Sequence, residues 1–368
     1  MLTHVITWIV EHLVGGKLMK KNYLIIIIVI LVAWNILLTA NVSDLRAHEK
    51  RPNYIIEEHR VSGFSTDLTE VAEKIGNACV TVQTANGTGS GVIFEQKGNK
   101  FYVVTAYHVV MDSDYMLQIN LDNFTSLQAT IVGYDKVKDV AVLSAECNYK
   151  VDVLEFGDSS ILNKGEYVLA IGSPLGLDFN GSMSLGIVSS NNRILSTKVE
   201  GVTYYNNMVQ SDVKLDMGQS GGALVNMDGE LVALNTGVIT SNNSSMTFSI
   251  PVDELKYICE HLVSDGEVKR LELGLKLHPI EDMHNYQKTA LGYGLDQVDG
   301  MYISNVTYAS IAEKLGLKKG DALIKINDYA INNYDSLYKA IYSREELKSI
   351  SVLRNDELVT VGVGQWLE

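Results

Sequence analysis

The chain has 368 residues, of which 46% are hydrophobic and 20% are charged, so it is too long for one ordinary domain and can fill two separate cores. Its 44 acidic and 30 basic residues give a formal net charge of -14. This charge repels polyphosphate and argues against nucleic acid as the main partner, whereas unfolded or cationic polypeptides remain acceptable partners.

The first predicted element is an uncharged apolar run over residues 23–40, which is just long enough to cross a hydrocarbon core as a helix. Lys17, Lys20 and Lys21 stand directly before this run. Basic residues on that side favour a cytoplasmic N-terminus over residues 1–22 and an extracytoplasmic remainder. We therefore expect a single-pass membrane protein anchored by this helix.

Two alternatives concern this N-terminal region. Residues 38–40 (LTA) approximate the small-residue pattern of a signal-peptide cleavage site, so the apolar run is alternatively a removed signal. Met19 followed by two lysines and the apolar run also has the pattern of a complete start. On that hypothesis, residues 1–18 are an upstream extension.

Residues 41–66 are polar, mixed in charge and without a sustained period, which predicts a stalk. Residues 67–78 then place apolar side chains at helical spacing. Asp67 is the expected N-cap of this helix, with Glu70 three positions later.

A long β-rich region follows, which we assign with the preceding helix to one domain over residues 67–265. Its short β-branched runs are separated by Gly, Asn, Asp and Ser, and no long helix intervenes, which predicts an all-β sandwich or barrel. The runs lie at residues 79–85, 89–95, 100–110, 116–122, 128–135, 139–146, 166–173, 184–190, 206–213, 222–228, 230–238 and 246–251. Pro251 then opens a helix that ends before Gly266 and closes this domain.

Residues 266–368 form a second, smaller mixed domain in this interpretation. Strands are expected at residues 271–277, 300–306, 349–355 and 358–364, and helices at residues 310–317 and 334–343. Cys79, Cys147 and Cys259 are odd in number and free of any CxxC spacing, so we expect small buried side chains, no disulfide framework and no metal site.

The strongest chemical signal is residues 218–222 (GQSGG). Ser220 lies between glycines, which give the backbone freedom and the open approach that a nucleophile and its oxyanion hole require. This pattern alone is only moderately specific, because a simple turn serine satisfies it, and so does the nucleophile elbow of α/β-hydrolases.

His108 and Asp139 supply the partners that Ser220 needs. His108 ends an apolar run where an imidazole has little packing reason to be, and Asp139 begins another, where burial demands a hydrogen-bonded neighbour. Their chain order of His, Asp and Ser on an all-β background is that of the chymotrypsin class. An α/β-hydrolase instead needs the acid and histidine after the serine, together with alternating helices, and these helices are missing.

At this point the sequence resembles the HtrA/Deg (high-temperature-requirement A) family of trypsin-like serine proteases over roughly residues 67–368. Seven blocks carry the resemblance in the same order. They are residues 87–93 (GTGSGVI), 105–110 (TAYHVV), 139–143 (DVAVL), 170–176 (AIGSPLG), 186–190 (GIVSS), 218–224 (GQSGGAL) and 248–251 (FSIP).

The resemblance implies a mainly β fold, with a double barrel of two six-stranded barrels around the active site, followed by a C-terminal α+β PDZ domain and a homotrimer or higher assembly. It assigns Ser220 as nucleophile, His108 as general base and then acid, and Asp139 as the group that orients the imidazole. The oxyanion hole falls on residues 218–220, with N–H groups from Gly218 and Ser220 around Gln219, which stands where the family usually has Asn.

The S1 pocket candidates are Lys214, Leu215, Asn235 and Thr236. Family members generally have a small apolar residue where Lys214 stands, so the sequence leaves two alternatives: an altered preference at P1, or a lysine whose head lies in solvent.

In the expected PDZ domain, Leu273, Gly274 and Leu275 resemble the loop whose N–H groups hold the terminal carboxylate of a hydrophobic peptide, with strand addition supplying further contacts. The alternative is a domain that packs against the protease without binding free C-termini.

The sequence therefore predicts an ATP-independent serine endopeptidase that cleaves unfolded or misfolded proteins at the extracytoplasmic face of a membrane, in protein quality control and stress response. We expect no metal or organic cofactor. The competing classes are a chaperone or scaffold with latent proteolysis, and a regulatory protease that cleaves one membrane partner at a specific site.

Overall fold

The computed structural model describes residues 34, 63–113, 116–241, 244–291 and 298–362. Apart from Trp34 and the last residues of the stalk, the predicted membrane helix and stalk lie outside this part of the chain. No helix among the described residues is long and apolar enough to span a bilayer. Helix α3 (Gly63–Ile75) begins four residues before Asp67, so Asp67 lies inside the helix, and the predicted N-cap there is wrong.

A seven-stranded antiparallel sheet follows the short 3-10 helix η1 (Gly76–Ala78). Its strands run in the order β5-β4-β1-β2-β3-β7-β6, and β5 also contacts β7, so the sheet curls. The expected six-stranded barrel is therefore a seven-stranded curled sheet. The strands are β1 (Cys79–Thr84), β2 (Gly87–Lys97), β3 (Lys100–Ala106), β4 (Leu117–Asn120), β5 (Ser126–Gln128), β6 (Thr130–Asp135) and β7 (Val140–Glu146).

The core of this sheet comes from side chains that are removed completely from solvent, among them Phe101, Ile119 and Leu143. Six successive residues of β7 are buried, which requires cover on both faces of the strand. The run expected to continue as a strand to Val110 instead turns at Ala106 into the one-turn helix α4 (Tyr107–Val110). This turn lifts His108 out of the sheet.

The next six strands close into a barrel in the order β10-β13-β12-β11-β8-β9. They are β8 (Tyr167–Gly172), β9 (Ser182–Val199), β10 (Val202–Ser211), β11 (Ala223–Val225), β12 (Leu231–Ser241) and β13 (Ser244–Pro251), with the 3-10 helix η2 (Leu177–Phe179) between β8 and β9.

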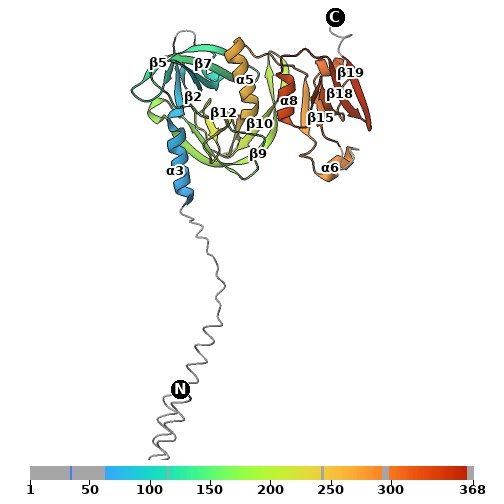
Figure 1. Cartoon of the computed structure of the whole chain (residues 1–368), viewed down its shortest axis with the longest axis horizontal. Coiled ribbons are helices and arrows are strands. Elements are labelled where there is room, and N and C mark those ends of the chain that lie inside the picture. The colour runs from blue at the N-terminus through green and yellow to red at the C-terminus, as the bar shows by residue number, and fades with distance from the viewer. Residues whose placement is uncertain (1–33, 35–62, 114–115, 242–243, 292–297, 363–368) are drawn as a thin grey trace, which may run out of the picture. The chain divides into compact units, whose positions relative to one another are not determined.

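Helix α5 (Val252–Asp265) packs across the strands, where Figure 1 draws it in gold. The helix expected after Pro251 is confirmed, and its apolar side chains Val252, Leu255, Ile258 and Leu262 are all buried. The helix ends at Gly266, whose φ of 74° and N–H donation to Leu262 O form a left-handed C-cap.

A separate sheet forms the C-terminal region, with strands in the order β14-β15-β16-β18-β19 and β17 paired to β16. Strand β14 is at the edge of this sheet. The elements are β14 (Leu275–Pro279), α6 (Asn285–Ala290), β15 (Met301–Val306), α7 (Ile311–Lys314), β16 (Ala322–Ile326), β17 (Tyr329–Ala330), α8 (Tyr334–Ile341), β18 (Ser349–Arg354) and β19 (Glu357–Gly362).

Buried polar contacts join this C-terminal sheet to the preceding strands and α5. Arg270 forms a buried ion pair with Asp135, the last residue of β6. Tyr342 donates a hydrogen bond of 2.9 Å to Glu254 on α5, and the Lys138 ammonium lies 2.6 Å from the same carboxylate. These charges are paired with one another as burial requires.

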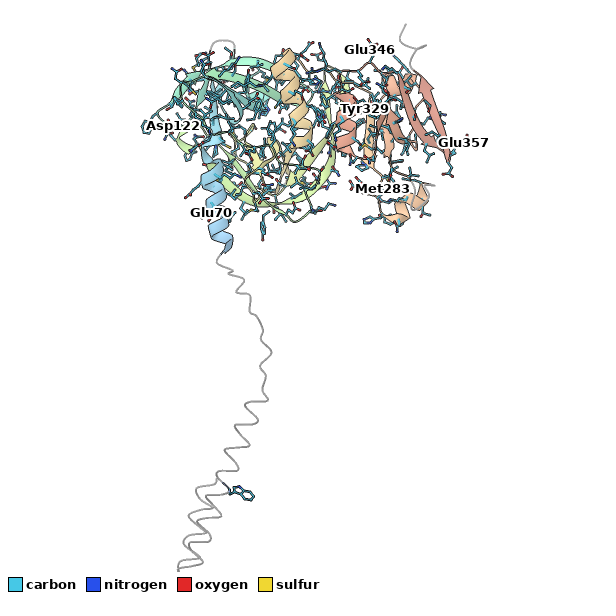
Figure 2. All side chains as sticks on the ribbon, viewed as in Figure 1. Glu70, Asp122, Met283, Tyr329, Glu346 and Glu357 are labelled. Atoms are coloured by element: carbon cyan, nitrogen blue, oxygen red, sulfur yellow. The ribbon has the colours of Figure 1, made fainter. Side chains whose placement is uncertain are left out.

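Many charged side chains lie on the outside, as Figure 2 shows for Glu70, Asp122, Glu346 and Glu357. The three cysteines are buried, which confirms that they are small buried side chains. Burial raises the pKa of the Cys79 thiol to about 12, so this thiol stays protonated near neutral pH.

Candidate active site

His108 and Asp139 meet because they follow neighbouring strands. Strands β3 and β7 pair up to Ala106 and Val140, so α4 after β3 and the turn before β7 lie side by side. His108 Nδ1 lies 2.7 Å from Asp139 Oδ2, and the His108 backbone N–H donates to Asp139 Oδ1 at 2.9 Å. This two-point contact fixes the imidazole against the carboxylate.

The backbone of Asp139 is bent to make these contacts. Its φ of 56° lies in the left-handed region, which aspartate tolerates better than most residues, and its carbonyl accepts from the Tyr107 N–H at 3.0 Å. The hydrogen bond to Asp139 raises the pKa of His108, against the opposing effect of burial. The carboxylate thus favours the protonated imidazole.

Ser220 lies where the barrel touches the first sheet, in the loop before β11. Its carbonyl accepts from the Ser90 N–H at 2.9 Å, and the next N–H, from Gly221, donates to Asn235 O at 2.7 Å. A Cβ at Gly221 would lie 2.3 Å from Ser90 O and 2.4 Å from Thr105 Oγ1, and the φ of this residue is 82°. Only glycine allows this close approach.

Ser220 and His108 line one cavity of about 350 Å³, together with Gly87, Gly218 and Met217. The Ser220 hydroxyl has Thr236 O as its acceptor at a long 3.5 Å, and among the described residues no hydrogen bond joins it to His108. Hydrogen bonds of a catalytic group are often long without substrate, so this geometry is compatible with activation on binding.

Two backbone N–H groups beside Ser220 have no acceptor within the described part of the chain, those of Gly218 and Ser220 itself. The Gln219 N–H between them donates to Asp216 O at 3.2 Å, and the Gln219 side chain accepts from the Asp216 N–H. Gln219 therefore braces the loop, while Gly218 and Ser220 keep N–H groups available for a developing oxyanion.

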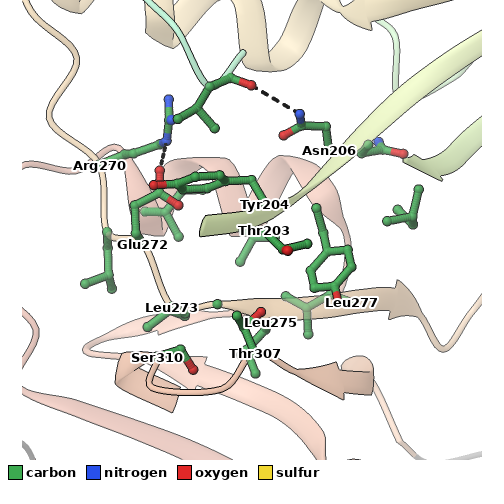
Figure 3. Close-up of a pocket in the computed structure, with 18 of the residues that line it drawn as sticks. Thr203, Tyr204, Asn206, Arg270, Glu272, Leu273, Leu275, Leu277, Thr307 and Ser310 are labelled. Atoms are coloured by element: carbon green, nitrogen blue, oxygen red, sulfur yellow. Dashed lines mark hydrogen bonds and ion pairs between the residues drawn. The ribbon is translucent and has the colours of Figure 1, made fainter. Parts of the chain in front are cut away.

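A second cavity, of about 290 Å³, lies between strand β10 of the barrel on one side and edge strand β14 and helix α8 on the other (Figure 3). Apolar side chains from β14 and α8 line it, including Leu275, Leu277, Leu337 and Ile341. At one end is the loop before β14, where Gly274 has a φ of 75°.

The loop before β14 is anchored from β15 and α7. The Thr307 N–H donates to Gly274 O at 2.8 Å, and the Ala312 N–H donates to Leu273 O at 3.0 Å. Within the described residues, the N–H groups of Leu273 and Gly274 have no acceptor. The loop thus presents two unpaired donors beside an apolar cavity.

Comparison with known proteins decides the family. Residues 89–234 match the trypsin-like peptidase domain. The serine protease Do-like HtrA of Lactococcus lactis subsp. cremoris is 30% identical over 323 residues, which cover 78% of this chain and 79% of the relative. The serine protease Do-like HtrB of Bacillus subtilis is 34% identical over 83% of this chain and 71% of the relative. The chain belongs to the HtrA family of serine proteases.

Other members of the HtrA family extend this result. The serine protease Do-like HtrA of Bacillus subtilis is 35% identical, over 75% of this chain and only 63% of the relative's length. Among solved structures, the HtrA-type protease AlgW with tripeptide is 25% identical, covers 80% of this chain and 94% of that chain, and has a TM-score of 0.57. The fold of this HtrA family member is therefore shared over most of its length.

The S1 candidates of this HtrA protease differ in exposure. The side chain of Lys214 is 77% exposed and pairs with Asp216 at 3.1 Å, whereas Leu215 is half-buried and packs against the barrel core. Asn235 is fully buried and bonds to Ala223 O. Thr236 is half-buried, and its carbonyl faces the Ser220 hydroxyl.

Sequence reasoning missed two buried serines behind the HtrA site, Ser90 and Ser173. The Ser90 hydroxyl donates to Gly218 O at 2.7 Å and accepts from the Ser173 N–H at 2.8 Å. Both lie in the blocks that carried the family resemblance, residues 87–93 and 170–176. These blocks were the signal that could have identified both serines, although they do not indicate that the serines contact residues 218–222.

Proposed function

We propose that the chain is a serine endopeptidase in which Ser220 is the nucleophile, His108 the general base and acid, and Asp139 the orienting carboxylate. The observation that carries this proposal is the two-point contact between His108 and Asp139 at a cavity shared with Ser220. The unpaired N–H groups of Gly218 and Ser220 add the oxyanion hole.

In the first step, Ser220 Oγ adds to the carbonyl carbon of the scissile bond while its proton passes to His108 Nε2. The π electrons of the carbonyl move to its oxygen, where the N–H groups of Gly218 and Ser220 stabilise the charge. Asp139 holds the Nδ1–H and stabilises the imidazolium. The C–N bond then breaks as His108 protonates the leaving amine, and water repeats the sequence to release the acid and regenerate Ser220.

We propose unfolded or misfolded polypeptides at the extracytoplasmic face of a membrane as the substrates, cleaved without ATP in protein quality control and stress response. One relative, from Halomonas elongata, is named a probable periplasmic serine endoprotease and is 35% identical over 76% of this chain. The apolar run of residues 23–40 would supply the membrane anchor, with the N-terminus in the cytoplasm. A homotrimer or higher assembly completes the proposal.

We further propose that residues 266–368 are a PDZ domain that binds hydrophobic C-terminal peptides. An extended peptide can add to edge strand β14 while its terminal carboxylate accepts from the N–H groups of Leu273 and Gly274. The cavity that β14 and α8 share with β10 would take the last side chain. We expect a peptide that ends in a free carboxylate to bind at least about 10-fold more tightly than the same peptide amidated at its C-terminus, as measured by calorimetry. Equal affinities would contradict this site.

Casein degradation by the purified full chain tests the peptidase. We expect cleavage by the wild type and by Ser144→Ala, which removes a buried hydroxyl from β7, and no cleavage by Ser220→Ala. Equal degradation by Ser220→Ala would remove Ser220 as nucleophile.

A chaperone or scaffold with latent proteolysis is the second candidate. The Ser220 hydroxyl, which has Thr236 O and not His108 as its partner, favours it. Absence of cleavage by the wild type, with and without hydrophobic peptides, together with suppression of casein aggregation, would establish this function.

A further inference from the structure

Two of the sequence blocks that have no part in the triad, residues 87–93 and 170–176, meet behind the Ser220 loop. Each contributes a serine that is removed completely from solvent, Ser90 on β2 and Ser173 after β8. The Ser173 N–H donates to Ser90 Oγ at 2.8 Å, and Ser90 Oγ donates to Gly218 O at 2.7 Å. A buried hydroxyl thus connects β2, the segment after β8 and the loop of the oxyanion hole.

Ser90 holds the Ser220 loop at a second point through its backbone. Its N–H donates to Ser220 O at 2.9 Å, and its own carbonyl accepts from Thr105 Oγ1 at 2.6 Å. Ser90 therefore contacts both Gly218 and Ser220, two residues of this loop whose N–H groups have no acceptor among the described residues.

The orientation of the Gly218 N–H depends on these contacts. A trans peptide unit directs its C=O and N–H to opposite sides. The Met217 carbonyl accepts from the Leu175 N–H at 2.8 Å, which directs the Gly218 N–H away from the segment after β8. On the other side of the same Cα, Gly218 O is held by the Ser90 hydroxyl.

Glycine needs such restraint because it has the widest backbone freedom of all residues. Gly218 has a φ of 94°, and a Cβ there would lie 2.6 Å from Ser173 O, so a bulkier and stiffer residue does not fit. The rigidity must come from the surroundings. The Ser90 hydroxyl is the side-chain group that restrains the Gly218 carbonyl.

We propose that Ser90 is a positioning residue of the oxyanion hole, and that its hydroxyl, by holding the Gly218 carbonyl, restrains the Gly218 backbone so that the Gly218 N–H faces the developing oxyanion. This inference rests on the proposed peptidase function. Ser90 touches no reacting atom, so its loss acts on the rate of the chemical step and leaves binding of the substrate unchanged.

Thr81 and Asn180 complete the support from behind. Thr81 Oγ1 donates to Ser173 Oγ at 2.7 Å, and Ser173 Oγ donates to Asn180 Oδ1 at 2.7 Å. An amide oxygen can only accept, so Ser173 donates to Asn180 Oδ1 and in turn accepts from Thr81. The hydrogen bonds of this row therefore run in one direction. Ser173 is thereby held in place to donate its N–H to Ser90.

The test uses the full chain with Ser90→Ala, a chromogenic peptide substrate and a peptide aldehyde. The aldehyde mimics the charged intermediate, since Ser220 Oγ adds to its carbonyl carbon, the hydroxyl proton passes to His108, and the former carbonyl oxygen occupies the oxyanion hole. We expect Ser90→Ala to lower kcat by about 10- to 100-fold, short of the loss seen when an oxyanion donor is removed outright. KM should stay within about twofold, and affinity for the aldehyde should fall by the same factor as kcat.

Ser144→Ala is the matched control, because Ser144 is also a buried hydroxyl on the first sheet, 3.1 Å from Thr130 Oγ1 and outside the site. Its kcat and aldehyde affinity should equal those of the wild type. A Ser90→Ala protein with kcat and aldehyde affinity within twofold of the wild type would overturn the proposal, and so would a rise in KM without a change in kcat.

Ser90→Cys covers the case in which Ser90→Ala fails to fold, because a thiol keeps the shape with a weaker donor and acceptor. We expect its kcat to lie between those of the wild type and Ser90→Ala. Full activity in Ser90→Cys would contradict a positioning role for the Ser90 hydroxyl. Cleavage by the wild type that is lost in Ser220→Ala stands independently of these results, so failure of this inference is distinguishable from failure of the peptidase function.

Discussion

Replacing Asp139 by Asn tests whether this carboxylate fixes the tautomer of His108. Asn keeps an oxygen where Asp139 Oδ1 accepts from the His108 backbone N–H at 2.9 Å. At the second position it places an NH₂ group 2.7 Å from His108 Nδ1, where the carboxylate oxygen lies now. The imidazole must then accept at Nδ1 and carry its proton at Nε2, where it cannot take the proton of Ser220.

The expected loss follows from this inverted hydrogen bond. A wrong tautomer lowers kcat by about 10⁴-fold in the chymotrypsin class, which corresponds to about 5 kcal/mol of transition-state stabilisation. The pKa of His108 should also fall, because the hydrogen bond to Asp139 is the main cause that raises it. The acid limb of the residual activity should therefore move to lower pH.

The assay is kcat/KM for a peptide substrate between pH 5 and pH 9. Asp122→Asn is the matched control. Asp122 caps an exposed loop through Oδ1, an oxygen that Asn retains, and among the described residues its Oδ2 accepts only from the Thr125 hydroxyl at 3.3 Å, so activity should be unchanged. If Asp139→Asn kept more than about a tenth of wild-type kcat, or an unchanged acid limb, Asp139 would not orient His108.

The remaining predictions concern pH, a buried pair and a glycine. The pKa of His108 is raised above its usual value near 6.5, so wild-type activity should fall as the pH drops below this raised pKa. The contribution of protonated His108 to the free energy of unfolding should be lost as the pH rises through the same raised pKa. Arg270→Ala leaves the buried Asp135 carboxylate unpaired and should lower the free energy of urea unfolding by about 3–5 kcal/mol. Lys269→Ala, which breaks an exposed pair, should lower it by about 0–1 kcal/mol, and equal losses would contradict the prediction. Gly221→Ala should abolish cleavage, since its Cβ would lie 2.3 Å from a backbone oxygen; normal activity would show that the loop can shift.

The sequence predicted most of the strands because β-branched runs between turn residues report local pairing. It also located the helix after Pro251, whose apolar face is buried. It missed β5, a strand of three residues with exposed ends that has no apolar run. It placed His108 in a strand, because the apolar pattern of residues 100–110 gives no indication of the turn at Ala106.

The candidate site was predictable as a set of residues and not as a geometry. His108 contacts Asp139 because β3 pairs with β7. The sequence supports this pairing only by indicating that both strands are buried. The direction of the Ser220 hydroxyl depends on the approach of Thr236, sixteen residues later, and no local pattern encodes it. Lys214 likewise lies in solvent and pairs with Asp216, a contact that the sequence allows and does not require.

The turn that carries Asp139 is held by residues that follow it by more than a hundred positions. Asp135 accepts from the N–H groups of Val137 and Lys138 within the turn and pairs with Arg270 beyond it. The Lys138 ammonium, one residue before Asp139, lies 2.6 Å from Glu254 on α5. A cation beside Asp139 would compete with His108 for the carboxylate, and Glu254 removes that competition by pairing with Lys138. The position and the charge environment of Asp139 are therefore properties of the whole fold, and this is why a local sequence pattern can name the residue without fixing its role.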